Sequence, residues 1–112
     1  ILCFDVGHPC VLHTGTASDD YLKWLSQSWP HPPILHLQQT DQTGDQHWPF
    51  TSEYNDKGVI RVKSILNAVQ HWSYNGEVYL FLEPIPSFEA KDSSVLHDLE
   101  ESVRYWQEAM RG

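Results

Sequence analysis

The sequence of 112 residues predicts an α/β fold, because strand-like segments alternate with helix-like segments three times along the chain. Apolar residues form short continuous runs in the first kind of segment and recur at helical spacing in the second. Successive strand–helix units imply parallel strands joined by right-handed helical crossovers. An open three-layer sheet and a TIM barrel both begin in this way, so secondary structure alone does not choose between them.

The first unit begins with residues 1–4, an apolar run that is typical of a buried strand. A helix is expected next, because Leu22, Leu25 and Trp29 recur at helical spacing and Ser18 offers an N-cap hydroxyl. The prolines that follow Trp29 predict the end of this helix.

The second unit begins with the apolar residues 34–37 and continues into a polar segment, residues 38–58. A loop of about 20 residues inside a compact domain is usually functional or mobile. A helix is predicted after it, and the Tyr74-Asn75-Gly76 sequence then predicts a turn. The apolar face of this helix consists of Val62, Ile65, Leu66, Val69 and Trp72.

The third unit begins with residues 78–82, which are apolar or aromatic throughout, as in a parallel strand covered on both faces. Pro84 and Pro86 predict the end of this strand. A last helix is expected after the cap candidates Asp92, Ser93 and Ser94. Its apolar face consists of Val95, Leu99, Val103, Trp106 and Met110.

Composition and charge exclude several classes of protein. The 7 Lys and Arg residues against 15 Asp and Glu residues give a net charge of −8, which disfavours binding to nucleic acid. No apolar run approaches the roughly 20 residues of a membrane span. The first ten residues lack a basic leader, and two cysteines are too few for a disulfide scaffold, so a cytoplasmic protein is expected. Cys3 is predicted to be a buried free thiol, and Trp24, Trp29, Trp72 and Trp106 are predicted to pack in the core.

Metal-competent side chains follow the predicted strands. Asp5 ends the first strand and His8 follows three residues later, His36 lies near the end of the second, and Glu83 directly follows the third. In α/β folds, ligands and catalytic groups collect at the carboxyl ends of the parallel strands. A single acidic residue at a strand end is more often a cap, but three successive strands ending in this way favour a divalent metal site.

The polar segment adds further candidates close to His36. Asp41, Asp45 and His47 follow it, and the Asp-x-His pair is succeeded by Trp48. Such a pair can bring two more ligand groups near the metal-competent residues of the strand ends.

Taken in order, these motifs resemble a known superfamily. Asp5-Val6-Gly7-His8, then His36, then Asp45-Gln46-His47, then Glu83 within LFLEP resemble the last three strands of the xylose-isomerase-like TIM barrels. That superfamily joins sugar isomerases and epimerases to endonuclease-IV-type repair enzymes. The segment HLQQTDQTGDQHWPFT is similar to the sugar-phosphate isomerase/epimerase branch. A closed barrel takes roughly 250 residues, so residues 1–112 are expected to be a C-terminal piece of one barrel domain, carrying its strands 6 to 8.

The resemblance also implies roles for individual residues. Asp5, His36 and Glu83 would bind a divalent metal ion (Mn²⁺, Mg²⁺, Co²⁺ or Zn²⁺), and Glu83 would be one of two acid/base carboxylates. The other essential Glu of the family comes from its fifth strand, which is not among these residues. The residues assigned to a sugar or sugar-phosphate substrate are His8, Gln38, Asp45, His47 and Trp48. In the nuclease branch Asp45 and His47 match further metal ligands instead, and His8 would meet a second metal.

The sequence therefore predicts part of a metal-dependent sugar or sugar-phosphate isomerase/epimerase that works by enediolate proton transfer. This piece is expected to be inactive alone, because the first five strands are absent. Two alternatives stay open: a metallo-phosphodiesterase acting on abasic DNA, and a non-catalytic piece. Open strand edges would allow association with another chain or with copies of itself.

Overall fold

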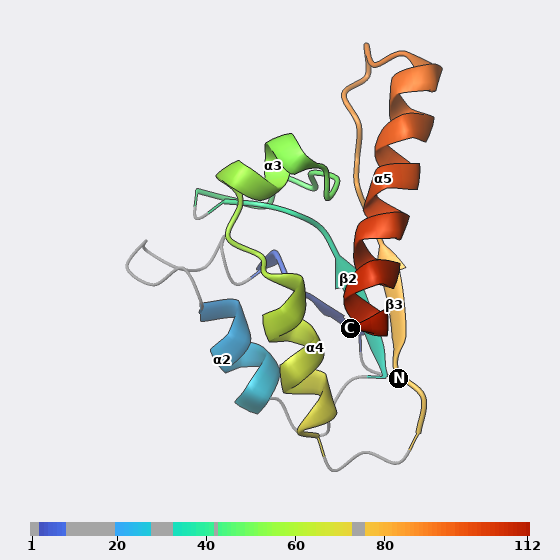
Figure 1. Ribbon diagram of the computed structural model, residues 1–112. Helices are drawn as coiled ribbons and strands as arrows, with labels where there is room; N and C mark the ends of the chain where they lie inside the picture. Colours follow the sequence, from blue (N-terminus) through green and yellow to red (C-terminus); the bar gives the residue numbers. More distant parts are fainter. Residues whose placement is uncertain (1–2, 9–19, 28–32, 42, 73–75) are drawn as a thin grey trace.

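A computed structural model describes residues 3–8, 20–27, 33–41, 43–72 and 76–112, and shows a parallel sheet covered by helices (Figure 1). The sheet consists of β1 (Cys3–Asp5), β2 (Ile34–Leu37) and β3 (Tyr79–Leu82), with β2 in the centre. Both neighbouring pairs are parallel, and the register pairs Asp5 with His36 and Leu37 with Leu82. The predicted α/β class and the parallel direction of the strands are confirmed.

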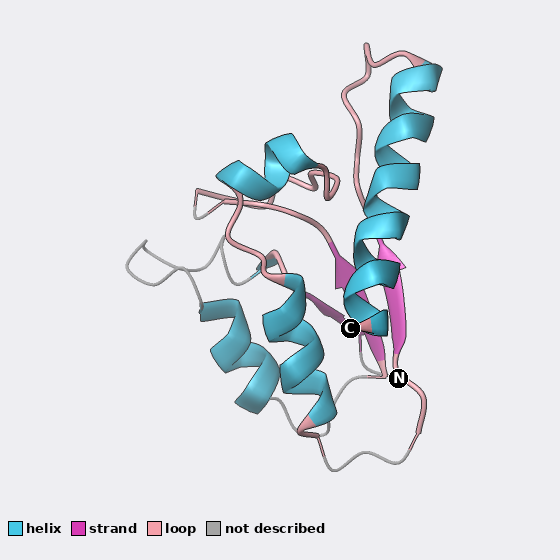
Figure 2. Ribbon diagram, viewed as in Figure 1, coloured by secondary structure: helices cyan, strands magenta, loops and turns pink. Residues whose placement is uncertain are grey.

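The helices bounded within the described residues are α2 (Asp20–Gln27), α3 (Ser52–Lys57), α4 (Val62–Gln70) and α5 (Asp92–Arg111). Figure 2 shows how they lie relative to the sheet. Helix α4 lies beside both α2 and α5. Three of these helices were predicted, and α3 was not, because its residues fall in the segment assigned to a long loop. The predicted cap Ser18, Trp29 and most of the 74–76 turn lie outside the described residues. No helix in the described part of the chain is long and apolar enough to cross a membrane.

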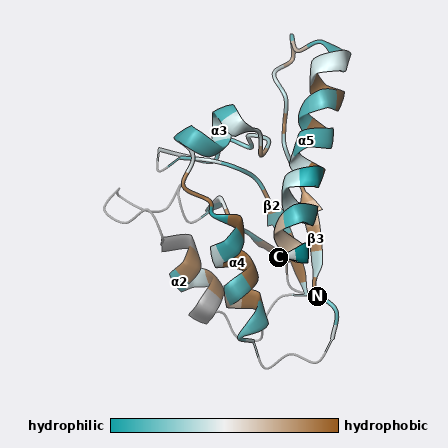
Figure 3. Ribbon diagram, viewed as in Figure 1, coloured by the Kyte–Doolittle hydropathy of each residue, from teal (hydrophilic) through white to brown (hydrophobic). Residues whose placement is uncertain are grey.

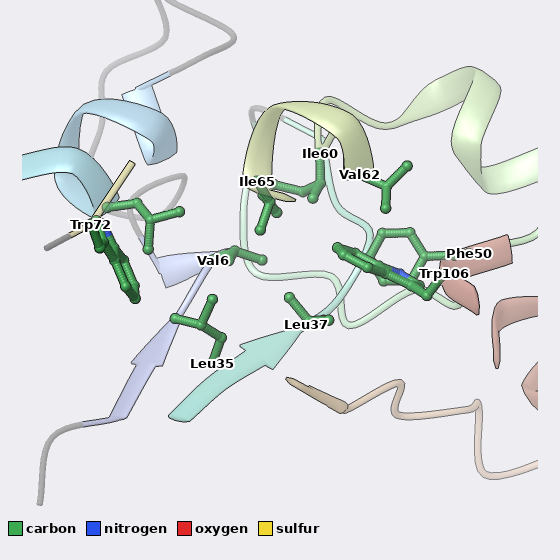
Figure 4. Close-up of a cluster of buried hydrophobic side chains, with 10 residues drawn as sticks. Val6, Leu35, Leu37, Phe50, Ile60, Val62, Ile65, Trp72 and Trp106 are labelled. Atoms are coloured by element: carbon green, nitrogen blue, oxygen red, sulfur yellow. The ribbon is translucent and has the colours of Figure 1, made fainter. Parts of the chain in front are cut away.

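The hydrophobic core lies between the sheet and the helices. Leu35 and Leu37 of β2 point toward Ile65 of α4, and Phe50 and Trp106 lie together at one side of this cluster (Figure 4). The Phe50 and Trp106 rings meet edge to face, with centroids 5.2 Å apart. Figure 3 shows hydrophilic and hydrophobic residues alternating along α4 and α5, as expected of helices with one buried face.

The opposite face of the sheet differs from the prediction. Tyr79 and Phe81 are 53% and 52% exposed, so β3 is covered on one face and not on both. Cys3 is exposed rather than buried. Alternate side chains of a strand point to opposite faces, and the described helices pack only against the face that carries Leu80 and Leu82.

Two further predictions need correction. Trp24 is 55% exposed, because its neighbour Leu25 takes the buried direction of α2. Trp72 and Trp106 are buried as predicted. Helix α5 is capped by Lys91, which makes no side-chain capping bond, whereas Asp92 lies in the first turn. There its carboxylate is favoured by the positive end of the helix dipole.

The described residues of the polar segment 38–58 are arranged around the buried side chain of Gln39. Its amide oxygen accepts from the backbone N–H of Ile60 at 2.9 Å, and its amide nitrogen donates to the Ile60 carbonyl at 3.0 Å. The backbone of Gln39 also exchanges two hydrogen bonds with Trp48, at 2.8 and 2.9 Å. A Cβ atom at Gly58 would collide with the Gln39 side chain, so glycine is needed for this close approach. Gln39, at the start of the segment, therefore holds Trp48 in its middle and Ile60 just after its end in fixed positions.

A turn beyond β2 is organised by Asp41. One carboxylate oxygen accepts from the Thr43 backbone N–H at 2.9 Å and from its hydroxyl at 2.6 Å. Gln46 donates to the same oxygen at 3.4 Å. Partial burial acts to raise the pKa of Asp41, but these donors outweigh it and hold the pKa below its ordinary value.

Replacing Gln39 with leucine is expected to destabilise the full-length protein by roughly 2–4 kcal/mol, because buried backbone groups of Ile60 lose their partners. Urea unfolding would measure the change. The matched control is Gln107→Leu on the exposed side of α5, where a change within about 0.5 kcal/mol is expected. Equal losses in the two variants would contradict the role given to Gln39.

The lowered pKa of Asp41 predicts a pH-dependent contribution to stability. A carboxyl group with a depressed folded-state pKa stabilises the fold above its unfolded pKa of about 3.9, and this contribution disappears as the pH falls through the folded-state value. Asp41→Asn is therefore expected to lower the urea midpoint at pH 7 and to change it progressively less below about pH 4. A difference that stays constant down to pH 2 would count against this assignment.

Candidate metal centre

Three side chains converge at the carboxyl edge of the sheet, one from each strand. Asp5 ends β1, His36 lies in β2, and Glu83 directly follows β3. One ligand atom from each lies within 4.8 Å of the others. The His36 Nδ1 atom is 2.7 Å from the Glu83 Oε2 atom. Asp5 is buried, whereas His36 and Glu83 are each about one-third exposed, so this group is open to solvent on one side.

The sheet register brings these residues together. Asp5 is paired with His36, and aligned residues of neighbouring strands direct their side chains to the same face. The Glu83 backbone N–H donates to the Leu37 carbonyl at 2.8 Å, which extends the pairing of β2 with β3 by one residue. Glu83 therefore follows Phe81 onto the face that carries His36.

The chemistry of this group suits a divalent cation. One imidazole and two carboxylates are donors that Mn²⁺, Mg²⁺, Co²⁺ and Zn²⁺ accept. Three protein ligands with a solvent-exposed side leave coordination positions open, which is the usual arrangement of a catalytic rather than a structural site.

A second group shares Asp5 with the first. Ligand atoms of Asp5, Asp45 and His47 also lie within 4.8 Å of one another. The His47 Nε2 atom is 3.1 Å from the Asp45 Oδ2 atom, and the His47 Nδ1 atom is 2.9 Å from the Glu83 carbonyl oxygen. His47 has a φ of 55°, in the left-handed region that few residues other than glycine adopt.

The surroundings of His47 favour its charged form. Partial burial acts to lower its pKa, but the Glu83 carbonyl and the negative charges of Asp45 and Asp5 together raise the pKa above its ordinary value. A carbonyl oxygen can only accept, so the Nδ1 atom of His47 is the donor to Glu83.

Gln38 lies between the two carboxylates of the second group. Its side chain is fully buried. Its amide nitrogen donates to the Asp5 Oδ1 atom at 2.9 Å and also to the Asp45 Oδ1 atom. Its amide oxygen accepts from the His47 backbone N–H at 2.6 Å. The hydrogen bonds of this amide are therefore made with three other candidate residues.

Gly7 is a residue of this site that the sequence analysis did not assign. Its backbone N–H donates to the Asp5 Oδ1 atom at 2.8 Å. A Cβ atom at this position would lie 2.5 Å from the Cδ atom of Gln38. Glycine is needed here because the Gln38 amide packs against the backbone. The position of Gly7 between the candidates Asp5 and His8 was the sequence feature that could have identified it.

The remaining candidates border the site. The His8 side chain is 62% exposed, and its Nε2 atom lies 3.6 Å from Asp5 and 3.7 Å from Asp45. Trp48 is half-buried against Tyr54, with ring centroids 5.1 Å apart. Trp48 and His47 both line a cavity of about 420 Å³ between this loop and α5. A cavity of this size is large enough for a small-molecule ligand, and His47 is the residue that connects it to the metal-competent groups.

Comparison with known proteins gives one relative to consider. Over 105 residues the chain is 30% identical to D-erythrulose 1-phosphate 3-epimerase of Brucella abortus (strain 2308). The match includes 91% of this chain and 33% of that enzyme, so the chain spans about a third of its relative's length. No family model matches the chain, and no solved structure matches it. The chain is thus distantly similar to a sugar-phosphate epimerase.

Proposed function

We propose that the chain is the C-terminal part of a metal-dependent sugar or sugar-phosphate isomerase/epimerase, in which Asp5, His36 and Glu83 bind the cation. The observation that carries this proposal is the convergence of the three side chains from three parallel strands. The similarity to an epimerase over most of the chain supports it independently.

The uncovered face of the sheet supports a barrel as the complete domain. In a TIM barrel the helices cover the outer face of each strand, and the inner face packs against the other strands. Tyr79 and Phe81 lie on the face that the described helices leave open, as side chains of a barrel interior would. This face also carries His36 and Glu83 at the carboxyl ends of their strands, the end of the barrel where barrel enzymes hold their catalytic groups.

Glu83 is the residue of this chain that we assign to proton transfer. A bound divalent cation would supply Lewis-acid polarisation of the carbonyl and hydroxyl oxygens of a ketose. The Glu83 carboxylate would take the proton from the carbon beside the carbonyl, and the C–H electron pair would move into the enediolate. For inversion, a second acid has to return a proton to the opposite face of that carbon.

The substrate would lie over the open side of the metal group. His8, Asp45, His47 and Trp48 keep some exposed surface there and are proposed to contact it. Gln38 has no exposed surface, so its effect on the substrate would pass through Asp5, Asp45 and His47.

A metallo-phosphodiesterase is the second candidate function. The observation that favours it is the Asp5, Asp45 and His47 group, which could hold an additional cation. Enzymes that cleave phosphodiesters commonly use two or more metal ions, whereas one ion is sufficient for enediolate chemistry. The net charge of −8 disfavours a nucleic-acid substrate.

The proposed reaction predicts exchange of a substrate proton with solvent. In D₂O the Mn²⁺-loaded full-length protein is expected to incorporate deuterium beside the carbonyl of at least one member of a panel of ketose phosphates, measured by NMR. Glu83→Gln is expected to lower kcat roughly 10²–10⁴-fold at saturating Mn²⁺, because the base is lost. Glu89→Gln, an exposed glutamate in the same loop, is the control and should stay near wild type. Absence of exchange across the panel would rule the proposal out.

The proposed ligands predict metal affinities. His36→Ala and Asp5→Asn are each expected to weaken Mn²⁺ binding by more than about tenfold, since even indirect partners of a metal commonly contribute that much. Isothermal titration calorimetry would measure the affinity. His97→Ala, on the exposed side of α5, should leave it unchanged. Undiminished Mn²⁺ binding by His36→Ala and Asp5→Asn would show that His36 and Asp5 are not ligands.

A further inference from the structure

The second carboxylate–imidazole group already contains a hydrogen-bond donor from the protein itself. The Gln38 amide nitrogen contacts Asp5 and Asp45 and lies 3.4 Å from the His47 Nε2 atom. These are the three residues whose ligand atoms could surround a second cation. The amide therefore takes the position that such a cation would need.

The orientation of the Gln38 amide is fixed by its partners. The backbone N–H of His47 can only donate, so the atom of Gln38 that faces it has to be the oxygen. The ionised carboxylates of Asp5 and Asp45 can only accept, so the other atom has to be the nitrogen. Rotating the amide by half a turn would leave all three contacts repulsive.

Packing keeps the amide in this position. The Gln38 side chain is fully buried, and the backbone of Gly7 lies directly against its amide carbon. A cation could contact Asp5, Asp45 and His47 together only after the Gln38 amide had moved away, and the His47 backbone N–H would then lose its acceptor.

We propose that Gln38 determines how many cations the centre binds. Its amide fills the space between Asp5, Asp45 and His47, so that Asp5 binds only the cation that His36 and Glu83 also bind. Gln38 is a positioning residue in this scheme. The inference rests on the proposed function for the first cation, and it explains how residues that could support a multi-metal phosphodiesterase belong here to a centre with one ion.

The test compares Mn²⁺ stoichiometry in the full-length protein, by equilibrium dialysis with metal analysis, and Mn²⁺–Mn²⁺ coupling by EPR. Gln38→Glu replaces the donor with a third carboxylate and is expected to add one equivalent of Mn²⁺ per chain. Gly7→Ala leaves Gln38 intact but displaces its amide, and the same gain is expected. Gln46→Glu is the matched control, since it adds the same charge at an exposed position of the same loop. It should bind no additional Mn²⁺.

Four outcomes decide the proposal. A gain of one equivalent in Gln38→Glu or Gly7→Ala that disappears when Asp45→Asn is added supports it, and so does the appearance of coupled Mn²⁺ pairs in those variants alone. Wild-type stoichiometry in both variants overturns it. Loss of an equivalent from the otherwise wild-type protein on Asp45→Asn also overturns it, and that measurement stands even if Gln38→Glu does not fold.

The Mn²⁺ stoichiometry of the wild type and the additional Mn²⁺ bound by the variants test different proposals. A wild-type protein that binds no Mn²⁺ contradicts the metal centre of the proposed function. The difference between wild type and the Gln38 and Gly7 variants still shows whether the amide excludes a cation from the second group.

Discussion

The parallel register of the three strands is the constraint on which the candidate site depends. Asp5, His36 and Glu83 are far apart in the sequence, and none of them lies near another until β2 pairs with both of its neighbours. A shift of either pairing by one residue would turn one side chain to the opposite face of the sheet. The buried Leu35 and Leu37 oppose such a shift, because it would expose them to water. The core and the site are thus specified by the same alternation.

The alternation of side-chain direction continues for two residues beyond β2, so that the adjacent Gln38 and Gln39 point in different directions. Gln38 follows His36 toward the carboxylates, whereas Gln39 follows Leu37 toward Ile60. Both amides are fully buried, and both are packed against a glycine, Gly7 in one case and Gly58 in the other. Because a buried amide is costly without partners, each glutamine holds a stretch of the polar segment in one arrangement. The left-handed backbone of His47 is maintained within this framework.

Periodicity and strand-end chemistry were sufficient to predict much of this arrangement. The three strands, the helices α2, α4 and α5, and the side chains brought together at the sheet edge follow from patterns within short stretches of sequence. Helix α3 was missed because its residues, from Ser52 to Lys57, carry no apolar face of their own and begin at a cap, Thr51, inside a polar segment. The burial of Gln38 and Gln39 depends on contacts with residues distant in sequence, such as Asp5 and Ile60, which no local pattern reveals. The exposure of Trp24, Tyr79 and Phe81 likewise depends on which faces of α2 and β3 pack against another element.

Under the proposed function, the open face of β3 would link the assembly of the barrel to the order of the candidate metal group. The Phe81 ring meets the His36 imidazole edge to face, with centroids 6.3 Å apart, and about half of the Phe81 surface is exposed. In the proposed barrel, a side chain packed on Phe81 would therefore restrict the imidazole as well. Closing that face and ordering His36 as a ligand would then be thermodynamically coupled, so that binding of the proposed cation and completion of the barrel would each favour the other.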